Sequence, residues 1–176
     1  MICSAEPSSA DETIVRMHIV KSCEEYWDTK FDSLYVPLRS IEVEVGQFGA
    51  LFSGDIEGWN GCNGNLFCGA AQCEFVIAYK GKLFSFLGLS LESIPHDDRR
   101  LLVSYHHESQ CSRSSGDDWY GYMPCYGISV WDQDTFVSQH SPVMEQVDIK
   151  FWIEALSEDT GKNEQVAFCT MCVMSY

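Results

Sequence analysis

Alternation of apolar and polar residues with a period of two is the sequence feature that most constrains how this chain can fold. In residues 41–45, Ile41, Val43 and Val45 fall on one side of an extended chain, and the two glutamates between them fall on the other. This is the pattern of a strand with one buried face. Other strand-like runs, either alternating or rich in β-branched and aromatic residues, are 75–79, 83–91, 101–105, 126–131, 147–154 and 166–176. The chain is therefore predicted to be built from β-strands.

Polar, turn-forming segments separate these runs and indicate how the strands connect. Asn60-Gly61 and Asn63-Gly64 can take the positive φ angles of tight turns, and the remaining breaks are 95–98, 112–118, 141–142 and 157–163. Spacings this short suit the antiparallel strands of a sandwich or barrel better than parallel strands, which need crossover helices. We expect an all-β protein, an antiparallel β-sandwich with at most one or two short helices.

One segment near the N-terminus carries helix signals. Ser22 and Glu25 have the spacing of a capping box ahead of several apolar residues, which predicts a short helix that ends before Pro37. Residues 13–20 fit a strand or a helix equally well. Residues 1–12 are predicted to form a flexible arm. Because the length is that of one domain and no repeat or linker is found, residues 13–176 are predicted to form a single sandwich domain.

The chain carries 26 Asp and Glu residues against 11 Lys and Arg residues, which gives a net charge of −15. Such a surface repels phosphate backbones, and this excludes tight nucleic-acid binding through a basic face. The longest apolar stretch, 83–91, is too short and too interrupted to span a membrane. The N-terminus lacks the basic start and apolar run of a signal peptide, and no Asn-x-Ser/Thr sequon occurs. These features favour an intracellular location.

Nine cysteines are an odd number, so they cannot all pair within one chain. Several of them lie in apolar strand-like runs, where a free cysteine behaves as a small hydrophobic residue. We therefore predict mostly reduced thiols, with Cys73, Cys169 and Cys172 reduced and buried. The Cys169-x-x-Cys172 spacing is typical of a metal or redox site, but residues three apart in a strand face opposite sides. A distorted metal site around Cys62, Cys68 and Cys73 stays open as an alternative.

Two groups of residues could carry catalysis, and neither forms a complete set. His106 and His107 lie near several carboxylates, but adjacent residues face opposite sides of a strand, and this favours a solvated loop entering a strand. Cys68-Gly69 and His18 are the minimum for a cysteine-dependent hydrolase. The glycine-rich surroundings expected of such a nucleophile are missing. We therefore predict no catalytic residue, no cofactor and no metal, and we keep the hydrolase as a third hypothesis.

From Gly49 to the C-terminus, the order of features resembles the jelly-roll capsid proteins of picorna-like RNA viruses. Residues 67–77 (FCGAAQCEFVI) resemble the aromatic-glycine-strand segment of such a subunit, and residues 98–106 (DRRLLVSYH) resemble the strand that follows. Residues 142–151 (PVMEQVDIKF) resemble the late pair of strands. Arg99 stands where that family has glycine, and the chain lacks a basic arm. The resemblance implies a jelly-roll subunit of a closed viral shell, located in the virion or the host cytoplasm.

A shell subunit needs no catalytic residue and acts through contacts with other protein chains, in a homo- or hetero-oligomer. Tryptophans would supply aromatic anchors for such contacts, and the candidates are Trp27, Trp59, Trp119 and Trp131. A second function stays open, because residues 53–59 (SGDIEGW) and the final strand-like run also resemble the C-terminal jelly-roll and Ig-like domain of plant immune receptors. That resemblance implies an intracellular recognition module.

Overall fold

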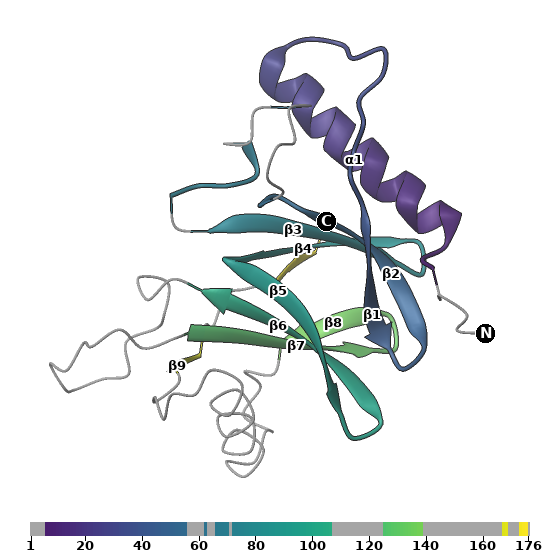
Figure 1. Ribbon diagram of the computed structural model, residues 1–176, viewed down its shortest axis with the longest axis vertical. Helices are drawn as coiled ribbons and strands as arrows, with labels where there is room; N and C mark the ends of the chain where they lie inside the picture. The colour runs from purple at the N-terminus through teal and green to yellow at the C-terminus, as the bar shows by residue number, and fades with distance from the viewer. Residues whose placement is uncertain are drawn as a thin grey trace, which may run out of the picture.

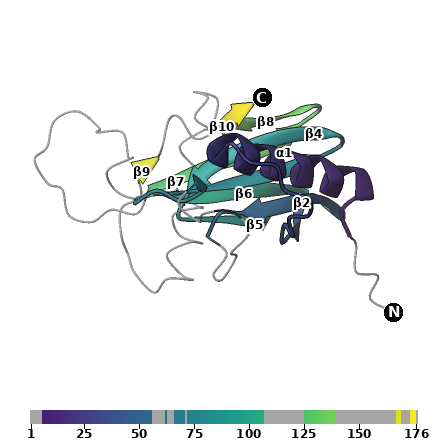
Figure 2. The same cartoon turned by 90° about the horizontal axis from the view of Figure 1, so that it is seen from above.

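The computed structural model describes residues 6–55, 62, 66–70, 72–106, 125–138, 167–168 and 173–175. In these residues one helix, α1 (Ser9–Trp27), covers the outer face of the first of two packed β-sheets (Figure 1). The view from above places the helix across the same sheet (Figure 2). The sheets remain separate and do not close into a barrel. The predicted all-β, antiparallel sandwich is confirmed.

The first sheet is an antiparallel meander whose strands lie side by side in chain order. They are β1 (Arg39–Glu44), β2 (Gln47–Ser53), β3 (Cys73–Tyr79) and β4 (Lys82–Gly88), and the short β10 (Val173–Ser175) pairs antiparallel with the free side of β4. Lys80 and Gly81, at φ of 51° and 76°, form the two-residue turn between β3 and β4. Two successive positive φ angles match the right-handed twist of a tight hairpin.

The second sheet is another antiparallel meander. Its strands are β5 (Ser90–His96), β6 (Arg99–His106), β7 (Cys125–Asp132) and β8 (Thr135–Ser138), and the short β9 (Ala167–Phe168) runs parallel to the start of β7. Leu89 is the single residue between the two meanders. Among the described strands the neighbours in each meander are therefore neighbours in sequence, which is a more local connectivity than the Greek-key crossings of a jelly roll.

Three apolar clusters are buried among the described residues, and two of them pack the layers against one another. Between the sheets, Trp131 of β7 makes edge-to-face ring contacts with Tyr79, Phe84 and Phe136, at centroid separations of 4.9, 5.6 and 5.1 Å. On the outer face of the first sheet, α1 buries a second cluster, whose members include Val15, Ile19, Cys23, Ala50, Phe52, Val76 and Ala78. Strands β3 and β4 are covered on both faces, which explains why their sequences carry apolar residues on both sides.

The helix begins earlier than predicted. Ser8 is its N-cap and accepts a hydrogen bond from the Asp11 N–H at 3.1 Å, whereas Ser22 lies inside the helix and donates to the His18 carbonyl at 3.0 Å. The prediction of a helix start at Ser22 is wrong. The Asp11 carboxylate is buried and accepts the Gly81 N–H at 2.8 Å, which fastens the first helical turn to the β3–β4 turn.

Residues 9–12 consequently belong to α1, and their assignment to a flexible arm is wrong. The ambiguous segment 13–20 is helical because Val15, Ile19 and Cys23 repeat every four residues and form one stripe that is fully buried against the sheet.

Among the described residues, no helix has the length and apolar character that crossing a bilayer requires.

Candidate interaction surface at the end of α1

The last turn of α1 exposes two large aromatic side chains. Tyr26 and Trp27 are 54% and 47% exposed, and their rings meet edge to face with centroids 5.2 Å apart. Figure 1 places this end of the helix on the outer side of the molecule, away from the second sheet. Exposed aromatic residues that hold one another in place are typical anchors of protein interfaces.

Hydrogen bonds around Glu24 shape the backbone that follows the aromatic pair. The Glu24 carbonyl accepts the Thr29 N–H at 3.2 Å, and its carboxylate accepts from the Lys30 ammonium at 2.6 Å and from the Phe31 N–H at 3.2 Å. The bond from Lys30, followed by that from Phe31, lowers the pKa of Glu24. Asp28 ends the helix in the left-handed conformation at φ 47°. The chain from 24 to 31 is thus a closed turn around one carboxylate.

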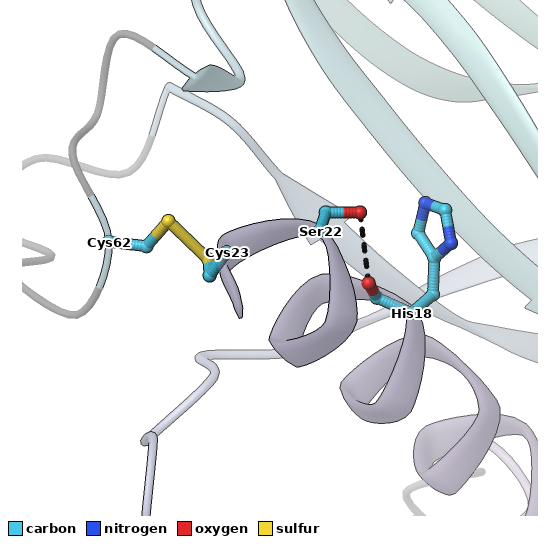
Figure 3. The surroundings of a disulfide bond; sticks show 4 residues. All are labelled: His18, Ser22, Cys23 and Cys62. Carbon is cyan, nitrogen blue, oxygen red and sulfur yellow. Dashed lines mark hydrogen bonds between the residues drawn. A yellow bond between two sulfur atoms is a disulfide. The ribbon is translucent and has the colours of Figure 1, made fainter. Parts of the chain in front are cut away.

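A disulfide fixes the same end of the helix from the inside. Cys23 is fully buried and is bonded to Cys62, with the two Cα atoms 5.8 Å apart. Figure 3 shows this bond joining α1, just beyond Ser22, to Cys62 on a separate segment of the chain. Both sulfurs belong to the apolar layer beneath α1. The exposed aromatic pair therefore sits on a helix end that is tied to a distant part of the chain.

A second disulfide joins Cys68 and Cys73 at the start of β3. The chain doubles back here, since the Gly69 N–H donates to the Gln72 carbonyl at 2.8 Å and the two cysteines face each other across a β-bridge. The prediction that Cys73 is reduced is wrong, because this local turn brings Cys68 opposite to it. The four cysteines whose side chains are described are all in disulfides, whereas Cys169 and Cys172 lie outside the described residues.

The four candidate tryptophans fall into different surroundings. Trp27 is on the exposed pair, and Trp59 and Trp119 lie outside the described residues. Trp131 is buried between the sheets, and its indole N–H has no hydrogen-bond partner in the described part of the chain. Its assignment to an interface is wrong, because a side chain enclosed by three aromatic rings is not available to another protein.

The residues considered for a hydrolase do not form its reactive centre. Cys68 is in a disulfide, and the nucleophile of such an enzyme must be a free thiolate. His18 lies half-buried on α1, where burial lowers its pKa and the nearby Glu74 carboxylate partly offsets that effect. Within the described ranges, His, Cys, Asp and Glu side chains do not gather in groups of three that could hold a metal ion.

A buried polar pair at the end of β6 was missed by the sequence analysis. His106 is 1% exposed, and its Nε2 lies 2.7 Å from the Oγ of the equally buried Ser104. Burial lowers the pKa of His106, which favours the neutral imidazole. The prediction of a solvated loop at this position is wrong for His106. The i, i+2 spacing of Ser104 and His106 on a strand was the available signal, since such residues share a face.

A groove of about 430 Å³ separates the outer edges of the two sheets. It is lined by Arg39, Ser40, Ile41, Glu42, Leu51, Leu91, Glu92 and Ser93. Ser93 donates to the Glu42 carbonyl at 2.6 Å, and Arg100 pairs with the Glu42 carboxylate. The bond from Ser93 occupies a backbone carbonyl of β1, an edge strand of the first sheet, which blunts the tendency of that edge to pair with another strand.

Comparisons with family models, curated proteins and solved structures found no match to this chain.

Proposed function

We propose that this protein has a non-enzymatic assembly role and acts through contacts with other protein chains. The observation that carries the proposal is the exposed Tyr26–Trp27 pair on a helix end that a disulfide and a closed turn hold in place. A rigid aromatic anchor loses little conformational entropy when it is buried in an interface. The same area of side chain on a mobile loop would bind more weakly.

The specific form of this proposal is a subunit of a viral shell. It rests on the sequence resemblance to capsid proteins of picorna-like viruses. The two antiparallel sheets agree with it, whereas the meander order of the described strands differs from the Greek-key crossings of a jelly roll. A stable contact in such an assembly buries on the order of 1,000 Å² or more, with aromatic anchors at its centre and a polar rim. Tyr26 and Trp27 are suited to be such anchors, and the acidic residues that flank them in sequence are suited to a polar rim.

The test isolates the full chain under native conditions from its natural source and measures its size by sedimentation, with electron microscopy of the same fractions. We expect the wild type in a complex much larger than its 19.9 kDa monomer. Trp27→Ala should release the monomer, whereas Met17→Ala, which removes another exposed apolar side chain of α1, should leave the complex intact. A wild-type protein that is monomeric at high concentration, with no partner, would contradict the proposal. Closed particles would support the shell form, and open complexes would contradict it.

A further inference from the structure

Acidic residues flank the exposed aromatic pair in sequence, and among the described residues some of them have no ion-pair partner. Residues 24–32 hold four acidic side chains and one lysine. Lys30 pairs with Glu24, and Lys21 lies 3.6 Å from Glu25. Asp28 and Asp32 are exposed and have no ion pair among the described residues. We call Tyr26, Trp27, Asp28 and Asp32 the helix-end surface.

The helix itself adds negative potential at the same place. The last turn of α1 contains no basic residue, so the partial negative charge of the carbonyl end is not compensated there. Aromatic ring faces also carry negative potential and attract ammonium and guanidinium groups. Three sources of negative electrostatic potential therefore contribute to the helix-end surface: the aromatic ring faces, the carboxylates and the C-terminus of the helix.

The charge of the whole molecule restricts what can dock there. With a net charge of −15, two copies of this chain repel each other at long range, and so do nucleic acids and anionic lipid surfaces. A positively charged partner is attracted both by the overall field and by the local surface. The complementary occupant is therefore a different chain with a basic binding segment.

We infer that the helix-end surface binds a basic segment of a partner protein, with an arginine or lysine side chain seated on the Trp27 ring and neighbouring basic side chains paired with Asp28 and Asp32. This inference rests on the proposed function and names its partner class. The disulfide at Cys23 and the turn around Glu24 fix the backbone that carries Tyr26, Trp27 and Asp28, and Asp32 directly follows Phe31, the last residue of that turn. The site is therefore preorganised, and little ordering cost opposes binding.

The test measures binding of a fluorescent arginine-glycine peptide to the purified full chain at low and at physiological salt. A glutamate-glycine peptide of equal length is the control ligand. We expect the basic peptide to bind and the acidic peptide not to bind. Trp27→Ala should weaken binding about five- to tenfold, as expected for loss of a cation–π contact. The double variant Asp28→Asn/Asp32→Asn should weaken it by a similar factor and reduce the salt dependence.

A matched variant separates this surface from general attraction to an acidic protein. Asp97→Asn/Asp98→Asn removes the same charge from the exposed β5–β6 turn and should leave affinity within about twofold, because charges beyond a Debye length are screened. Equal weakening by both double variants, with no effect of Trp27→Ala, would overturn the inference. No binding of the basic peptide would overturn it as well. The proposed function would survive either result if the native complex still depended on Trp27.

Discussion

The protonation of His106 is set by its buried surroundings in the fold and not by its neighbours in sequence. It lies inside the sandwich at the end of β6, with Ser104 as its hydrogen-bond partner. Its pKa is lowered by burial, so the folded protein keeps it neutral at a pH where the unfolded chain takes up a proton. The folded state therefore loses stability relative to the unfolded chain as the pH falls below the ordinary histidine pKa of 6.5.

The prediction is that His106→Gln makes stability less dependent on pH between 7.5 and 5.5. Uptake of one proton on unfolding costs at most about 1.4 kcal/mol per pH unit, and the variant should lose this contribution. Urea denaturation at several pH values measures it. His18→Gln is the control for the other histidine with a lowered pKa, and it should change the pH dependence less, because the Glu74 carboxylate partly offsets the effect of burial on the pKa of His18, whereas burial acts alone on that of His106. Parallel pH profiles for wild type and His106→Gln would contradict the prediction.

At the scale of single elements, the two disulfides organise the segment between β2 and β3. Cys23–Cys62 joins residues 39 positions apart and fastens this segment to α1, while Cys68–Cys73 closes a turn of five. Disulfides are typical of proteins that fold in oxidising compartments.

The longer disulfide is predicted to stabilise the fold more than the shorter one. In the chain-entropy model, a loop of 39 residues contributes about 4 kcal/mol and a loop of five about 2 kcal/mol. Cys23→Ala/Cys62→Ala should therefore lower the free energy of unfolding by roughly twice as much as Cys68→Ala/Cys73→Ala. Chemical denaturation of both variants tests the order. Thiol titration of the unfolded wild type, which should find these four cysteines unreactive before reduction, tests the pairing itself.

At the scale of the whole molecule, Trp131 joins the two sheets. It belongs to β7 but contacts Tyr79 and Phe84 of the first sheet as well as Phe136 of its own. Removing it leaves a cavity that neither sheet can fill alone. We expect the two meanders to unfold as one cooperative unit because they share this cluster.

Trp131→Ala is predicted to cost about 3–5 kcal/mol of stability, as truncation of a buried aromatic residue does. Trp27→Ala should change stability by less than about 1 kcal/mol, because its side chain is half exposed, and should act on assembly instead. Thermal unfolding followed by calorimetry separates the two. A large loss of stability in Trp27→Ala would show that its effect on assembly is indirect, and a mild effect of Trp131→Ala would contradict the joining role.

The sequence by itself determined the local parts of this structure. Runs 41–45, 75–79 and 101–105 were predicted as strands, and they correspond to β1, β3 and β6, because an alternating pattern records which face of a strand is buried. The two-layer sandwich followed from the number and spacing of such runs. The helix start at Ser9 could not be predicted in this way, since residues 13–20 fit both the two-residue period of a strand and the 3.6-residue period of a helix. They are helical in the structure because the Val15–Ile19–Cys23 stripe packs against the sheet.

Only the tertiary structure decided which residues of one type are buried and which are exposed. Trp27 and Trp131 are the same residue type and were equal candidates, yet one ends an outer helix and the other lies between the sheets. Cys73 pairs with Cys68 because a local backbone turn brings the two together, whereas Cys23 pairs with Cys62, which lies 39 residues further along the chain. Burial and pairing depend on non-local packing, which a sequence pattern of a few residues does not encode.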